Sequence, residues 1–66
     1  MTIQYQGNEE ETTVTTVAAF LAGKGVNAKT AIVEYGGEIY GAESDLAALS
    51  LTDGAELNVF NIVSGG

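Results

Sequence analysis

The chain has 66 residues, 45% of them hydrophobic and 17% charged, which is enough apolar material for one small folded domain. It contains no Cys and no His, which excludes disulfides and the usual zinc and thiol sites. Nine Asp and Glu against two Lys give a formal charge of -7, which repels phosphate backbones and anionic lipids, so we expect no nucleic-acid or membrane partner.

The chain begins with a pattern typical of a β-hairpin. Residues 2–6 alternate with a period of two, which predicts a half-buried strand with Ile3 and Tyr5 facing the core. Gly7-Asn8 is the expected turn, because this residue pair is common in tight hairpin loops. The Thr-rich residues 10–14 then predict a second strand.

A short helix is expected next, because the apolar spacing changes from two residues to three or four. The apolar stripe of this helix consists of Val17, Phe20 and Leu21. Thr15 or Thr16 can cap its start with a side-chain oxygen. Gly23 and Gly25 follow the stripe and favour a left-handed C-cap, so the helix should have about two to three turns.

A second hairpin is predicted in the middle of the chain. Residues 30–35 and 38–40 have strand composition, and Gly36-Gly37 between them suits a two-residue turn in which both residues have positive φ. Ser44-Asp45 then opens a brief helical turn through Leu46 and Leu49.

The most apolar segment, residues 56–63, predicts the last strand and follows a turn at Thr52-Asp53-Gly54. One face of this strand would carry Leu57, Val59 and Val63, packed beneath the helix. Phe60 and Ile62 would lie on the opposite, open face, where an apolar pair often marks a partner surface. A bulge that turns Phe60 inward is the alternative.

The element order β-β-α-β-β-β predicts the fold. So few apolar stripes are best buried between two layers, one of them a sheet that the helix covers on one side. We therefore expect an α+β, ubiquitin-like β-grasp fold, with a mixed sheet of four to five strands packed on one main helix. Residues 1–66 would form a single domain with a flexible tail at residues 64–66.

That tail, Ser64-Gly65-Gly66, is a candidate functional group. Two residues without side chains make a slender, flexible lead that can thread a narrow channel and present its α-carboxylate to another protein's active site. The alternative is a frayed polar tail.

The remaining polar residues predict no catalytic or metal site. Glu9-Glu10-Glu11 should be a solvated part of the hairpin, because adjacent carboxylates on a strand point to opposite faces. Lys24 and Lys29 are expected to be solvated and not to act as nucleophiles, since neither lies in an apolar run that would desolvate its ammonium group. We therefore expect that the chain is not an enzyme and binds no cofactor.

Three segments resemble the thiamine-biosynthesis sulfur carrier family (ThiS). They are residues 16–21, the turn at Thr52-Asp53-Gly54 and residues 57–66. Their order and the chain length are also similar to those of the family. The sequence departs from the family pattern in having Gly36-Gly37 where an Asn-Gly turn is usual, and Gly41-Ala42 where a Pro-Arg pair is common.

The resemblance implies a cytoplasmic carrier activated by a partner enzyme. A ThiF-like enzyme would use ATP and Mg²⁺ to adenylate the carboxylate of Gly66, with Ser64 and Gly65 threading its active site and Phe60 and Ile62 at the interface. A sulfur donor such as a cysteine desulfurase would then supply the sulfur of a thiocarboxylate. Thiazole synthase would receive that sulfur.

Three alternatives stay open on the sequence. The chain could carry sulfur for molybdopterin or cysteine synthesis, or it could be a ubiquitin-like modifier that forms isopeptide bonds with lysines. It could also be a non-catalytic β-grasp binding module, in which the Gly-Gly end is incidental, because one fold hosts many functions.

Overall fold

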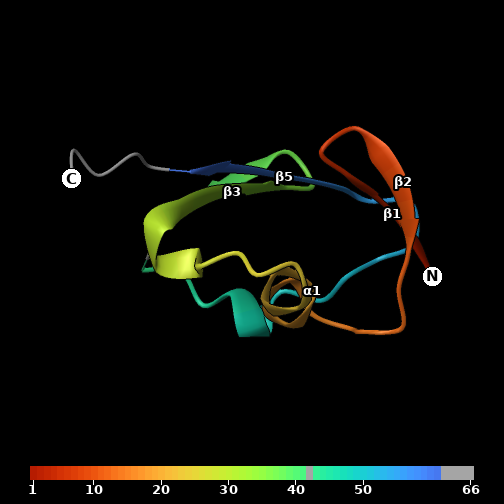
Figure 1. The fold of residues 1–66 in the computed structure, drawn as a ribbon, viewed down its shortest axis with the longest axis horizontal. Coiled ribbons are helices and arrows are strands. Elements are labelled where there is room, and N and C mark those ends of the chain that lie inside the picture. Colours follow the sequence, from red (N-terminus) through yellow and green to blue (C-terminus); the bar gives the residue numbers. More distant parts are fainter. Residues whose placement is uncertain (42, 62–66) are drawn as a thin grey trace.

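The computed structural model describes residues 1–41 and 43–61, which form a sheet with one α-helix packed beneath it (Figure 1). The strands are β1 (Thr2–Tyr5), β2 (Asn8–Glu11), β3 (Ala31–Tyr35), β4 (Glu38–Tyr40) and β5 (Glu56–Asn61). The helical elements are α1 (Val17–Gly23) and two 3₁₀ turns, η1 (Ala28–Thr30) and η2 (Leu46–Ala48). The predicted α+β class and order of strands are confirmed, while η1 was not predicted.

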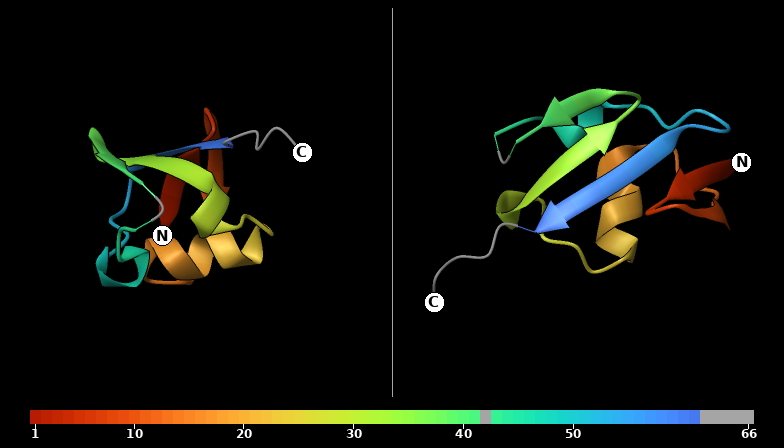
Figure 2. Two further views of the ribbon diagram at one scale, coloured as in Figure 1. Left: turned by 90° about the vertical axis from the view of Figure 1, so that its left-hand side faces the viewer. Right: turned by 90° about the horizontal axis from the view of Figure 1, so that it is seen from above.

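β5 lies in the middle of the sheet, whose strand order is β2-β1-β5-β3-β4. It runs parallel to β1 and antiparallel to β3, so the sheet is mixed, as predicted. Seen from above, β5 passes between β1 and β3 while α1 crosses beneath the strands (Figure 2). This is the predicted β-grasp arrangement, in which the central strand joins two hairpins into one sheet.

The α1 helix begins and ends where its capping residues predict. The Thr16 hydroxyl oxygen accepts a hydrogen bond from the Ala19 backbone N–H at 3.1 Å, so Thr16, not Thr15, is the N-cap. At the other end Gly25 has a φ of 73°, and the Val26 N–H donates to the Leu21 carbonyl at 3.0 Å. This left-handed ending satisfies carbonyls that the last turn would otherwise leave unpaired.

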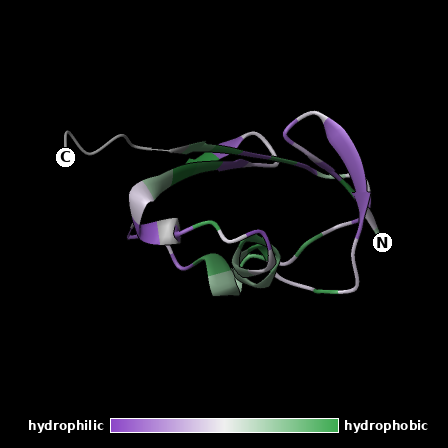
Figure 3. Cartoon of the chain, in the orientation of Figure 1, coloured by the Kyte–Doolittle hydropathy of each residue, from purple (hydrophilic) through white to green (hydrophobic). Residues whose placement is uncertain are grey.

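The core lies between α1 and the lower face of the sheet. Its buried side chains are Ile3, Val17, Phe20, Leu21, Ala31, Val33, Leu46, Leu51, Leu57 and Val59. Figure 3 shows this division of polarity, with a mainly hydrophilic β2 and hydrophobic residues along α1, η2, β3 and β5. The predicted apolar stripe of the helix is therefore confirmed, and no polar or charged side chain is buried among the described residues.

The first hairpin differs from its prediction by a shift along the chain. Its turn consists of Gln6 and Gly7, with φ values of 52° and 81°, and not of Gly7-Asn8. Both residues adopt positive φ, which matches the twist of the flanking strands. β2 therefore starts at Asn8, which pairs with Tyr5, and its last partner in β1 is Thr2. The expected strand over residues 10–14 was wrong in its bounds for this reason.

The second hairpin follows its prediction closely. Gly36 and Gly37 form the turn, with φ values of 59° and 86°. Asp45 caps η2 by accepting from the Ala47 N–H at 3.2 Å, at the predicted position of the helical turn. None of the helices in residues 1–41 and 43–61 has the length and hydrophobicity needed to cross a bilayer.

Candidate functional site

The alternation of β5 places its residues on the two faces of the sheet as predicted. Leu57 and Val59 are buried against the helix layer, whereas Phe60 is 56% exposed. Phe60 therefore lies on the open face, and the alternative of a bulge that turns it inward is wrong. Ile62 and Val63 lie outside the described residues, as do Ser64, Gly65 and Gly66.

β5 is held to the first hairpin beyond the end of the β1 ladder. The regular pairing with β1 covers only Glu56 and Leu57. Two residues further along, the Gln6 side-chain amide donates to the Val59 carbonyl at 2.9 Å, and its oxygen accepts from the Val59 N–H at 3.0 Å. The Gln6 side chain thus acts as one more strand residue and anchors β5 next to Phe60.

Three apolar side chains form a surface on the open face, here called the open-face patch, which consists of Ile32, Ile39 and Phe60. Ile32 is the register partner of Phe60, so the two side chains share a face. Ile39 pairs with Glu34, which in turn pairs with Asn58, and this row runs beside the first on the same face. The patch therefore extends across β5, β3 and β4.

The sequence interpretation missed two residues of this surface, the half-buried Ile32 and the exposed Ile39. Ile39 is 62% exposed, more than Phe60. The strand that carries it has only three residues, so alternation alone could not assign Ile39 or Tyr40 to the core face. A usable signal was the Gly36-Gly37 turn, because a two-residue turn fixes which residues of the two strands face each other.

Acidic and neutral polar groups lie beside the open-face patch. Glu34 accepts a hydrogen bond from the Asn58 side-chain nitrogen at 3.0 Å, and Glu56 is exposed on the same face of β5. The two basic residues of the chain, Lys24 and Lys29, belong to the C-cap of α1 and to η1, in the helix layer. The open face of the sheet therefore carries negative charge without a compensating Lys or Arg.

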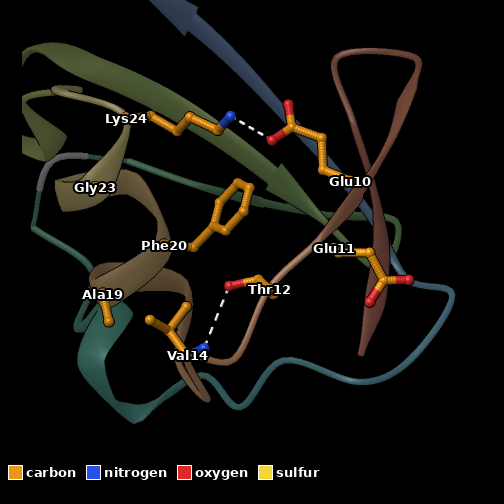
Figure 4. Close-up of a pocket in the computed structure, with 8 residues that line it drawn as sticks. All are labelled: Glu10, Glu11, Thr12, Val14, Ala19, Phe20, Gly23 and Lys24. Atoms are coloured by element: carbon orange, nitrogen blue, oxygen red, sulfur yellow. Dashed lines mark hydrogen bonds and ion pairs between the residues drawn. The ribbon is translucent and has the colours of Figure 1, made fainter.

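Lys24 is not simply solvated, as the sequence interpretation had it. Its ammonium group forms an ion pair with Glu10 of β2 (Figure 4). The same group lies 5.3 Å from the ring centre of Tyr5 and 5.5 Å from that of Phe20. The two rings themselves meet edge to face, with centres 5.1 Å apart. Lys24 thus links the end of α1 to the first hairpin.

A shallow depression of about 210 Å³ lies between this hairpin and α1 (Figure 4). Its lining includes Phe20 and three charged residues, Glu10, Glu11 and Lys24, of which Glu10 and Lys24 form an ion pair. No group of three or more acidic side chains in residues 1–41 and 43–61 is placed to hold a metal ion. Among the residues that line the depression, no nucleophile is in contact with a base. The depression therefore resembles the gap between two packed elements rather than a catalytic site.

Comparison with solved structures gives a match over the whole chain. The crystal structure of a thiamine biosynthesis protein (ThiS) from Geobacter metallireducens aligns with a TM-score of 0.79 over 100% of both chains, at 23% sequence identity. This similarity establishes that the chain has the fold of a ThiS protein, in agreement with the resemblance seen in the sequence. No protein-family model matches the chain. No curated protein matches it at significant similarity either.

Proposed function

We propose that this chain is a sulfur carrier for thiamine biosynthesis, with the α-carboxylate of Gly66 as its functional group. The observation that supports the proposal most strongly is the match to a thiamine biosynthesis protein over the full length of both chains. In sequence, the central strand β5 ends at Asn61, and Ile62 and Val63 separate it from Ser64-Gly65-Gly66. A chain end of three small residues that follows a central strand by two positions is well suited to present a carboxylate.

The chemistry needs a partner, because a carboxylate is a poor electrophile. In the proposed reaction, an oxygen of the Gly66 carboxylate attacks the α-phosphate of ATP on a ThiF-like enzyme, and pyrophosphate leaves with Mg²⁺ assisting. When the donor is hydrosulfide, its sulfur attacks the acyl carbon, AMP leaves, and a thiocarboxylate results. When the donor is the persulfide of a cysteine desulfurase, the same attack releases AMP and gives an acyl disulfide, and a thiol reductant then cleaves the S–S bond to leave the thiocarboxylate. The chain is the substrate of this sequence of reactions, and the partner enzyme is the catalyst.

The proposed location is the cytoplasm, where ATP is available, and the proposed acceptor of the sulfur is thiazole synthase. The last three residues, fully extended, reach roughly 10 Å at about 3.3 to 3.6 Å each. A Cβ at Gly65 or Gly66 would widen the tail and crowd a narrow channel of the partner. Phe60 and Ile62 are proposed to contact the partner beside the tail.

Intact-mass measurement tests this function. The chain is incubated with ATP, Mg²⁺, a sulfide source and a purified ThiF-like enzyme, and we expect the mass increase that replacement of one oxygen by sulfur produces. Fragmentation should confine the increase to Gly66. An unchanged mass, with an enzyme that activates its own carrier in parallel, would reject the sulfur-carrier function for that enzyme.

The exposed Phe60 favours one second candidate, a β-grasp binding module with no role for the tail. In that case removal of Gly65 and Gly66 would leave partner binding unchanged, while substitution of Phe60 would abolish it. The two candidates therefore make opposite predictions for a tail deletion.

A further inference from the structure

We propose that Lys29 is the acceptor of an intramolecular acyl transfer from Gly66. When the activated carboxylate meets no sulfur nucleophile, the ε-amine of Lys29 captures it and closes the chain into a ring through an isopeptide bond. This inference rests on the proposed function and goes beyond it, because it gives the activated chain a second product and gives Lys29 a chemical role.

Strand register brings Lys29 to the end of the sheet from which the tail begins. Ala31, the first residue of β3, is the register partner of Asn61, the last residue of β5. Lys29 lies two residues before Ala31, in η1, and Figure 2 shows η1 beside the end of β5 in the view from above. With paired Cα atoms about 4.5 to 5.5 Å apart and at most about 3.8 Å for each step along the chain, the Cα atoms of Lys29 and Asn61 are no more than about 13 Å apart.

The tail is long enough to cover this separation. Five residues, 62–66, follow Asn61, and their extended length is roughly 17 Å at about 3.3 to 3.6 Å each. The four-carbon stem of the Lys29 side chain adds to this reach. A short connection holds two groups at an effective concentration in about the millimolar range, which exceeds the concentration of a second chain in a dilute sample.

The backbone around Lys29 is fixed while its side chain is exposed. The Asn27 side-chain oxygen accepts from the Lys29 N–H at 2.9 Å, and the Thr30 N–H and hydroxyl donate to the Asn27 carbonyl at 3.1 and 3.2 Å. Within residues 1–41 and 43–61, the exposed Lys29 side chain makes no hydrogen bond or ion pair. An exposed amine on a fixed turn is well placed to act as a nucleophile.

The two other amines of the chain are engaged. The ammonium group of Lys24 pairs with Glu10 and lies against two aromatic rings. The α-ammonium group of Met1 donates to the Thr12 carbonyl at 2.9 Å. Because β1 runs parallel to β5, Met1 lies at the opposite end of the sheet from Asn61 (Figure 1). Position and exposure therefore both favour Lys29.

The reaction needs no reagent beyond those of the proposed function. The neutral ε-amine of Lys29 attacks the acyl carbon of the Gly66 adenylate, so that a C–N bond forms and the bond from carbon to the phosphate oxygen breaks. AMP leaves, and the nitrogen gives its proton to water. Over activation and transfer the chain loses one water, and ATP becomes AMP and pyrophosphate. Ring closure consumes the carboxylate, so chains activated without sulfur would be lost as carriers.

This role qualifies the expectation that Lys29 does not act as a nucleophile. The expected solvation of its side chain is confirmed by its exposure. A solvated lysine has little reactivity toward an ordinary carboxylate, but an acyl adenylate is already activated. Proximity then supplies what desolvation supplies elsewhere, because it converts a bimolecular reaction into an effectively unimolecular one.

Activation without a sulfur source tests the acyl transfer. The chain is incubated with ATP, Mg²⁺ and a purified ThiF-like enzyme, and intact mass should show a product lighter by one water. Digestion should give a peptide in which Gly66 is joined to Lys29. Lys29→Arg should reduce this product at least about tenfold, because a guanidinium stays charged, whereas the matched control Lys24→Arg should retain it. Added sulfide should suppress the ring and restore the thiocarboxylate.

A second experiment removes the enzyme from the test. The full chain is prepared with a thioester at Gly66 by intein cleavage and kept in mildly alkaline buffer. Attack by Lys29 then releases the thiol and gives the same ring. Lys29→Arg should leave the thioester to slow hydrolysis and keep the urea midpoint of the unsubstituted chain, since the side chain lies outside the core.

The outcomes separate this inference from the proposed function. Ring closure at Lys29 in the thioester chain, without activation by the enzyme, would support the acyl transfer and reject the sulfur-carrier function for that enzyme. A thiocarboxylate formed with sulfide, without a ring in either experiment, would support the function and overturn the acyl transfer. A bond to Lys24 or Met1, or a product of two joined chains, would also overturn it. Absence of both activation and ring closure would overturn both proposals.

Discussion

The side-chain amide of Gln6 pairs with both backbone polar groups of Val59, as a residue of a neighbouring strand would. β1 has already ended at Tyr5, and Gln6 is in the hairpin turn with a φ of 52°. The Gln6 backbone N–H donates to the Leu57 carbonyl at 3.0 Å, and the Gln6 side chain extends the contact between the first hairpin and β5 by two further residues, to Val59. Val59 is buried, so without Gln6 its polar groups would lack partners on that side.

Gln6→Ala should destabilise the fold by about 1 to 2 kcal/mol, because it leaves the Val59 N–H and carbonyl without these hydrogen bonds. In a domain of this size each kcal/mol corresponds to a decrease in Tm of about 4 to 8 °C. Gln4→Ala is the matched control, since the Gln4 side chain makes no hydrogen bond with the described residues. Thermal unfolding of both variants checks the prediction, and equal losses would contradict it.

Lys24→Met should cost about 0.5 to 1 kcal/mol at low salt, because it removes the ion pair with Glu10 and the contact of the ammonium group with two aromatic rings. Lys29→Met makes the same change in net charge without a described ion pair. Urea unfolding of both variants separates the stability that comes from these contacts of Lys24 from the effect of the change in net charge. The difference between them should shrink at high salt, and a difference that grows would contradict this explanation.

Gly36→Asn should maintain or raise stability, by up to about 1 kcal/mol, because Asn tolerates the left-handed backbone and restricts the unfolded chain more than Gly does. The φ of 59° at Gly36 suits Asn at the first turn position, and an added Cβ would meet nothing within 4 Å. Gly36→Val, with a branched side chain at the same φ, should be destabilising. Denaturant midpoints test this predicted order of stability. A Val variant that is more stable than the Asn variant would contradict it.

Leu57→Ala should reduce the free energy of unfolding much more than Phe60→Ala does, although the two residues lie in the same strand. Leu57 is fully buried, so its truncation should cost about 2 to 5 kcal/mol through lost contacts and a cavity. Phe60 is 56% exposed and loses only its cross-strand contact with Ile32, worth less than about 1 kcal/mol. Urea unfolding measures both, and a comparable loss for Phe60 would place it in the core.

Deletion of Gly66 should abolish adenylation by a ThiF-like enzyme while leaving the urea midpoint unchanged. The proposed reaction needs the carboxylate at the full reach of the tail, whereas the described core ends with β5. Pyrophosphate release measures adenylation, and unfolding controls for stability. A truncated chain that is still activated at the normal rate would reject Gly66 as the reactive residue.

The sequence predicted those parts of the fold that depend on local spacing. A Thr N-cap at 15 or 16, a left-handed C-cap at Gly23 or Gly25 and the Gly36-Gly37 turn each follow from a short stretch of chain, and the structure selects Thr16 and Gly25 and confirms the turn. The exposure of Phe60 also followed from alternation along β5. These features share one property, namely that residues close in sequence determine them.

The features that escaped prediction depend on contacts between distant residues. Gln6 and Val59 are 53 positions apart, and Lys24 and Glu10 are 14 apart on elements whose approach no local pattern encodes. The first turn was placed one residue late, which hid the role of Gln6. Ile39 was overlooked because β4 is too short to show a period, and its exposure depends on which face the helix covers.

The central place of β5 also has a consequence for folding. Each hairpin can close locally within microseconds, but the strand between them is the last in sequence and must bridge a loop of some 50 residues. Until it inserts, β1 and β3 expose free edges that can pair with other chains. Insertion of β5 closes both edges at once, so the chain is protected from such pairing only when its last strand is in place.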